Sequence, residues 1–239
     1  SILKDEQWDA LEFVQSWNEY NFINGSTWYA ILQGQILYTY EDYEKALEVM
    51  DNYAQELSPN LIMFPVSQYY FYYPLILTAL YQKKSPSQQK NFRKILKESS
   101  QKLKKWAEYC PENFLHQSLL LQAEIAKISG ESWEKITSLY TQAIDSAHQY
   151  QLIHIEALAQ ELAAKFWLSK NQIDFAKIYL KKAHYCYQLW GANSKVKDLE
   201  NKYYDLLNSH TPSSINPDLT EEKIPLKDTP TNSLDLVSV

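Results

Sequence analysis

One long run of helical periodicity limits what this 239-residue chain can fold into. Apolar side chains recur between Ile155 and Trp167 at i, i+3, i+4, i+7, i+8, i+11 and i+12, which is the spacing of one broad buried face of an α-helix. A second run with the same helical spacing of apolar residues extends from Ala176 to Tyr187. Asn171 between the two runs is a residue type that ends helices in the left-handed conformation. So short a connection predicts two antiparallel helices.

The second helix of this pair has two copies earlier in the chain. The three copies begin at Tyr43, Trp133 and Ile173 and carry apolar residues at matching positions. Their separations of 90 and 40 residues exceed the tetratricopeptide (TPR) period of about 34, which favours TPR-like pairs with extended helices. Gly34 and Ala164 each lie twelve positions before an alanine of the following helix. Small residues there would let paired helices approach closely.

Glycine content and the end of the chain define the expected organisation. The chain has only 4 glycines, whereas β-rich folds and phosphate-binding loops use many. We therefore expect an all-α fold, an antiparallel helix-pair TPR-like superhelical repeat domain over residues 1–208. Residues 209–239 contain four prolines and no aromatic residue, so they predict a disordered linker or tail. The chain starts without methionine and ends in the apolar run Leu234–Val239, so we expect it to be cut from a longer protein.

Charge and motif content exclude several classes of function. A net charge of -6 argues against nucleic-acid binding, which needs a basic surface. The sequence lacks the phosphate-loop, dinucleotide, zinc-protease, hydrolase and kinase signatures, and its five histidines show no metal-ligand spacing. We expect no catalytic, metal or cofactor site. The longest apolar stretch, Tyr69–Tyr81, is 13 residues long, against about 20 for a membrane span. With two cysteines and no signal peptide, a cytoplasmic location is predicted.

Two features are candidates for a partner-binding surface. The first is an aromatic run, in which Tyr69, Tyr70, Tyr72 and Tyr73 flank one phenylalanine. On a helix these rings cannot all face one core, so they predict either a partner surface or packing between two helix layers, and the packing alternative is favoured.

The second feature is the basic stretch Lys83–Lys105, with nine basic residues and one acidic residue. Its apolar residues form a helical stripe, so the basic side chains, Lys94 and Lys97 among them, line the opposite face. A solvated face is favoured over a docking surface for an acidic partner.

Longer motifs carry a resemblance to a known family. The most distinctive are Cys110–His116, Glu156–Phe166, Ala183–Tyr187, Trp190–Ala192 and Lys195–Glu200. They resemble the helical region of large, mostly cyanobacterial, multi-sensor signal-transduction multikinases. Asn21–Gly25 and Tyr70–Tyr73 are similar to the same family further upstream, so the resemblance covers nearly all of residues 5–207.

The resemblance implies a domain order and a role. In that family a serine/threonine kinase domain and an AAA-like or STAND-type ATPase precede this region, and a GAF domain and a histidine kinase follow it. None of the family's catalytic residues falls in this chain. The first hypothesis is therefore a non-catalytic module that docks neighbouring domains or another signalling protein and transmits a signal. The alternative is a free-standing TPR-type adaptor that binds a peptide in its concave groove. An enzyme comes third.

Overall fold

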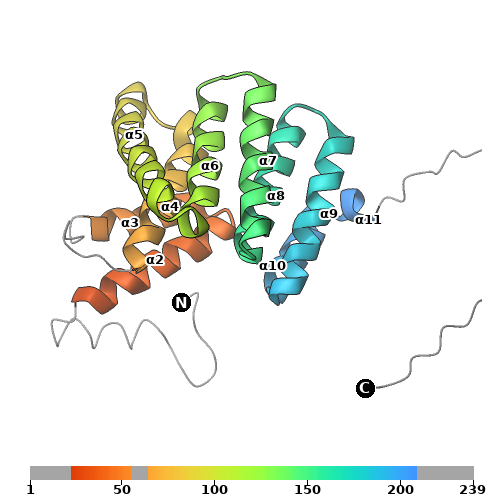
Figure 1. The fold of residues 1–239 in the computed structure, drawn as a ribbon, viewed down its shortest axis with the longest axis horizontal. Coiled ribbons are helices and arrows are strands. Elements are labelled where there is room, and N and C mark those ends of the chain that lie inside the picture. The colour runs from red at the N-terminus through yellow and green to blue at the C-terminus, as the bar shows by residue number, and fades with distance from the viewer. Residues whose placement is uncertain (1–22, 55–63, 209–239) are drawn as a thin grey trace, which may run out of the picture. The chain divides into compact units, whose positions relative to one another are not determined.

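A computed structural model describes residues 23–54 and 64–208 of the chain. The described residues are all-α, with ten α-helices, one short 3₁₀ helix and no strand (Figure 1). The helices are α2 (Ile23–Thr39), α3 (Tyr43–Ala54), α4 (Phe64–Leu80), η1 (Tyr81–Lys83), α5 (Pro86–Tyr109), α6 (Pro111–Ile128), α7 (Trp133–Gln149), α8 (Ile153–Ser169), α9 (Ile173–Trp190), α10 (Asn193–Lys202) and α11 (Tyr204–Asn208). All of them belong to one compact unit that ends at Asn208. The expected tail lies outside the described residues.

Consecutive helices pack against each other along the chain, as the repeat predicted. The strongest contacts join α8 with α9, α6 with α7, and α5 with α6. Figure 1 shows α6 to α9 standing side by side in chain order. The three expected repeat copies begin where the sequence placed them, because Tyr43, Trp133 and Ile173 are the first residues of α3, α7 and α9. The antiparallel helix-pair fold is therefore confirmed.

Local signals in the sequence explain where the helices begin and end. The Ser132 side chain accepts a hydrogen bond from the backbone N–H of Lys135 and caps the start of α7. Asn171 and Gly191 follow α8 and α9 with φ of 56° and 79°, so both helices end in the expected left-handed conformation. These ends allow each connection to be short, which keeps neighbouring helices antiparallel.

A small residue lets α2 and α3 pack closely. Gly34 is buried, and a Cβ atom built on it would lie 2.5 Å from Cε and 2.7 Å from Cγ of Met50. Ala164 and Ala176 play the equivalent part between α8 and α9, and both are fully buried. The close approach expected from the sequence at these positions is therefore present.

The helices α4 and α8 are buried on every side in their middle turns. In α8 the eight successive residues from Ala157 to Ala164 are all buried, and in α4 so are those from Phe71 to Thr78. Eight residues make more than two turns of helix, so no face of these segments is free. Pro74 lies within this part of α4, and the helix continues through it to Leu80.

Candidate interaction surfaces

A carboxylate lies at the centre of the packed interior of α8. Glu161 is 1% exposed, and its oxygens accept hydrogen bonds from Tyr187 Oη at 2.8 Å, Lys195 Nζ at 3.0 Å and Lys165 Nζ at 2.7 Å. Burial alone would raise the pKa of Glu161, but the two ammonium groups outweigh it and hold the pKa below its ordinary value. The buried charge is therefore stable only with its partners in place.

The two lysines tie this carboxylate to the turn between α2 and α3. Lys195, on α10, is 2% exposed and also donates a hydrogen bond of 2.8 Å to the backbone carbonyl of Thr39. Lys165, on α8, forms an ion pair of 3.1 Å with Glu41, whose φ of 68° is left-handed. Glu41 in turn lies 3.3 Å from Lys202 of α10. The first described helix pair is thus fastened to α8 and α10.

This arrangement decides which surfaces a partner can reach. A TPR array that binds a peptide in its concave groove needs free faces on the first helix of each pair. Here the middle turns of α4 and α8 are buried. The α2–α3 turn is held against α10 by the hydrogen bond from Lys195 and against α8 by the partly exposed ion pair of Lys165 with Glu41. Open hollows lie between α5, α6 and α7 and between α7, α8 and α9.

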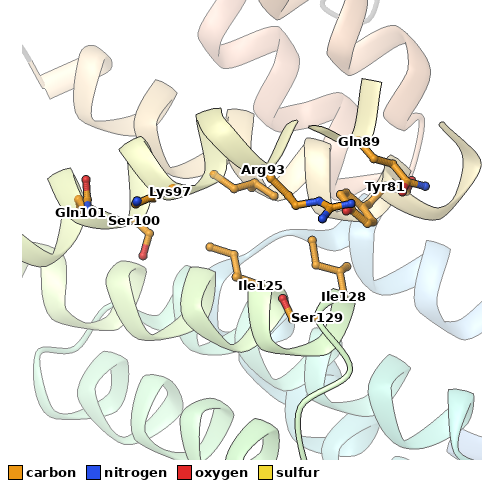
Figure 2. Close-up of a pocket in the computed structure, with 10 residues that line it drawn as sticks. Tyr81, Gln89, Arg93, Lys97, Ser100, Gln101, Ile125, Ile128 and Ser129 are labelled. Carbon is orange, nitrogen blue, oxygen red and sulfur yellow. The ribbon is translucent and has the colours of Figure 1, made fainter. Parts of the chain in front are cut away.

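One open surface is a groove between α5 and α6 with a volume of about 670 Å³. Figure 2 shows Arg93, Lys97 and Ser100 of α5 facing Ile125 and Ser129 of α6 across it. Leu96, Ile125 and Ile128 give this groove an apolar floor. At one end, the Gln89 amide donates hydrogen bonds to the backbone carbonyls of Tyr81 and Lys84. Among the described residues, two cations and no carboxylate line this groove.

The positive charge in this groove is not neutralised by nearby residues. Neither Arg93 nor Lys97 forms an ion pair with a carboxylate of the described residues, and the Arg93 guanidinium lies 5.8 Å from the centre of the Tyr81 ring. The groove continues toward α7 through Ser100, Ile125 and Ser129, which also line an adjoining hollow of about 350 Å³. Together the two hollows, which we call the cationic groove, run over α6 from α5 to α7. The α7 part is also lined by Glu131, which pairs with Lys135 at 3.0 Å.

Comparison with known families assigns this repeat array. The family described as CHK1-like, TPR repeats matches residues 13–208. The chain belongs to this family. As a CHK1-like TPR domain, it has the helix-repeat architecture of protein-interaction modules, which is typically non-catalytic. Within the described ranges no cluster of histidine, cysteine or acidic side chains is suited to hold a metal ion.

One curated relative of this CHK1-like TPR domain is named as a signalling kinase. Hybrid signal transduction histidine kinase G of Dictyostelium discoideum is 36% identical over 115 residues, which are 48% of this chain. The chain spans about 3% of the length of that relative. No solved structure matches the chain. No helix in the described part is long and apolar enough to cross a membrane.

Two of the four tyrosines that were candidates for a partner surface are buried in the structure. Tyr72 and Tyr73 are 3% and 7% exposed, so they pack inside the domain, as the favoured alternative held. Tyr69 and Tyr70 are half-buried, and Tyr69 stacks on Tyr73 with 4.8 Å between ring centres. Tyr70 lies under the ammonium of Lys102 at 3.8 Å. The aromatic run therefore mainly packs α4 against its neighbours.

The expected basic residues have different surroundings. Lys94 and Lys97 are both exposed, but only Lys97 lines the cationic groove, where Arg93 lies one turn before it. Two carboxylates of the described residues, Glu161 and Glu124, are buried. Glu124 is held by Tyr140 and Lys127. Their helical register beside apolar residues was the only signal of burial, and it does not identify a partner.

Proposed function

We propose that this CHK1-like TPR domain is the non-catalytic docking module of a larger signalling kinase, and that its cationic groove binds an acidic segment of a neighbouring domain or of a partner protein. The observation that carries the proposal is the pair Arg93 and Lys97, which lie over an apolar floor between α5 and α6, the part of the groove that no carboxylate of the described residues lines. A charged pair without counter-ions favours an acidic ligand, and the apolar floor adds buried area to the contact.

Further support comes from what the domain leaves open. The middle turns of α4 and α8 are buried, and the α2–α3 turn is fastened to α8 and α10 by the Lys165–Glu41 ion pair and the Lys195–Thr39 hydrogen bond. A peptide in the concave groove would have to displace these contacts. The cationic groove requires no such rearrangement. The histidine kinase named among the relatives makes a kinase the natural setting, and the family resemblance implies an ATPase domain upstream.

The first test is a binding experiment with the flanking domains of the native protein. Size-exclusion chromatography with light scattering would compare this domain alone and mixed with the ATPase domain expected upstream. We expect a joint peak at low salt that weakens as salt rises, because exposed charges are screened. Two independent peaks at every salt concentration would remove the support for docking between these two domains.

A charge-reversal pair tests the surface. In the variant Arg93→Glu/Lys97→Glu we expect association to be lost. The matched control is Lys104→Glu/Lys105→Glu, which makes the same change in net charge on the same helix outside the groove. If both variants weaken binding equally, net charge and not the groove is responsible. Circular dichroism should show unchanged helix content, since all four side chains are exposed.

A further inference from the structure

The outer face of α9 carries a regular stripe of exposed apolar side chains. Phe175, Ile178, Tyr185 and Leu189 are between 50% and 58% exposed. Together with Lys182 they follow one another at intervals of three, four, three and four residues, which is the a and d spacing of a coiled-coil seam. We call these five side chains the α9 stripe. From residue 175 to residue 189 the stripe extends about 21 Å along the helix.

The α9 stripe lies opposite the side of the helix that packs inside the domain. On that other side Ala176, Leu180 and Ala183 are buried in a core that includes residues of α8 and α10. Exposed apolar side chains on the outer face add nothing to this core. Their presence therefore needs a reason other than the folding of the repeat.

The equivalent faces of the other repeat copies are polar. When the copies that begin at Tyr43, Trp133 and Ile173 are aligned, the positions of the α9 stripe correspond to exposed polar residues. In α7 these are Lys135, Ser138, Gln142, Asp145 and Gln149, and in α3 the first three are Lys45, Glu48 and Asn52. The repeat therefore folds without apolar residues at these positions. Exposed apolar area that only one copy carries indicates an interaction surface.

A second copy of α9 is the occupant that the described residues favour. A seam of a and d residues is covered by another seam of the same spacing. Of the eleven large apolar side chains that the described residues expose, six belong to α9, and no other helix exposes more than one. Within the described part of the chain, only the α9 stripe of another copy can therefore match this one.

Charge near the stripe also fits a second copy. Lys181 and Lys182 line the hollow between α7, α8 and α9 together with Asp145 and Glu156. The formal charges of these four side chains sum to zero, so the hollow favours neither an acidic nor a basic partner. A surface that carries both signs can pair with itself across a two-fold axis, as an isologous dimer interface requires. A single lysine within a seam also specifies register and oligomeric state, at a cost in stability.

We propose that two copies of this chain form a two-fold symmetric dimer in which the two α9 stripes pack against each other. The stripe shares no residue with the cationic groove, so each copy in the dimer keeps its groove open. The dimer forms whether or not the cationic groove binds a ligand, and it does not depend on the proposed function.

Sedimentation velocity of the whole chain over a series of concentrations tests the dimer. We expect a monomer–dimer equilibrium for the wild type. Ile178→Glu and Leu189→Glu should each raise the dissociation constant of the dimer by about a hundredfold or more, because they place a charge in the apolar contact. The matched controls are Ser138→Glu and Gln149→Glu, which introduce the same residue at the equivalent positions of α7 and should leave the constant unchanged. Circular dichroism should show unchanged helix content, since all four side chains are exposed.

Removal of the charge within the stripe should have the opposite effect. In Lys182→Leu we expect the dissociation constant to fall about tenfold, because no ammonium group then has to lose water in the contact. Gln142→Leu makes the equivalent change on α7 and should leave the constant unchanged. A Lys182→Leu dimer that is weaker than the wild type would place the contact elsewhere and overturn the proposal.

The remaining outcomes also decide the matter. A wild-type chain that stays monomeric at every concentration would overturn the dimer and leave the α9 stripe to a different protein. Equal weakening by the α9 and α7 variants would show that net charge, and not the stripe, controls association. Arg93→Glu/Lys97→Glu should dimerise as the wild type does, so a failure of the dimer is separate from a failure of the cationic groove.

Discussion

The ammonium of Lys195 donates a hydrogen bond of 2.8 Å to the backbone carbonyl of Thr39, a residue 156 positions earlier in the chain. The same ammonium lies 3.0 Å from both Glu161 and Asp198. One buried lysine therefore joins the turn after α2 to α8 and α10. In a repeat protein most contacts are between neighbours, so this link makes distant repeats unfold together.

Removal of this lysine should cost a large part of the stability. In Lys195→Met we expect the free energy of unfolding to fall by about 3 kcal/mol, because Glu161 and the Thr39 carbonyl lose a buried partner. Urea denaturation measures the loss. The control is Lys45→Met, which removes an exposed lysine paired with Asp42 and should cost no more than about 1 kcal/mol. Similar small losses in both variants would show that the buried link contributes little.

Stability should fall on mild acidification because of His116. This side chain is 1% exposed, its Nδ1 has no partner among the described residues, and burial with the nearby His154 lowers its pKa to about 4. Since the folded pKa lies below the ordinary value of 6.5, the unfolded state takes up the proton first. The contribution of His116 to the free energy of unfolding is fully present above pH 6.5. It is lost between about pH 6.5 and 4, by about 3 kcal/mol in total.

The comparison that isolates this effect uses His116→Gln. Its free energy of unfolding should vary less with pH across the same interval than that of the wild type. His148→Gln, which removes a mostly exposed histidine, should follow the wild-type curve more closely. Parallel curves for wild type and His116→Gln would mean that other groups cause the pH dependence.

Close packing of α2 on α3 should make Gly34 intolerant of a methyl group. Alanine normally stabilises a helix relative to glycine by about 1 kcal/mol. Here its Cβ would lie 2.5 Å from Met50 Cε, so we expect Gly34→Ala to destabilise the domain by about 1–2 kcal/mol. In the Met50→Ala background the same change should be neutral or stabilising, and thermal unfolding of the four proteins gives the coupling. Independent effects would contradict the proposed contact.

The end of α9 should depend on backbone conformation alone. Gly191 has φ of 79°, and a Cβ there would meet no atom within 4 Å. Gly191→Ala should therefore cost about 1 kcal/mol from the left-handed backbone and nothing from contacts. Asn171→Gly at the end of α8, with φ of 56°, should be close to neutral. Thermal melting of both variants checks this, and a stable Gly191→Ala would show that the turn can change its conformation.

Much of the fold could be predicted because its signals are local. The starts of α3, α7 and α9, the left-handed ends at Asn171 and Gly191, and the close approach at Gly34 all follow from residue type and helical spacing. The candidate sites were predicted less well. Lys97 lines the cationic groove, and its role in docking stays a prediction, whereas Tyr72 and Tyr73 are buried. A run of aromatic residues shows that rings lie on several faces, but not which face another helix covers.

The sequence by itself determined the all-α class, the repeat and the starts of α3, α7 and α9, because these depend on residues within a few turns of each other. Only the tertiary structure decided that Lys195 meets Thr39 and Glu161. Those relationships depend on how successive helix pairs stack, and small rotations between pairs add up along the chain. Contacts between distant repeats therefore leave no periodic pattern that the sequence alone reveals.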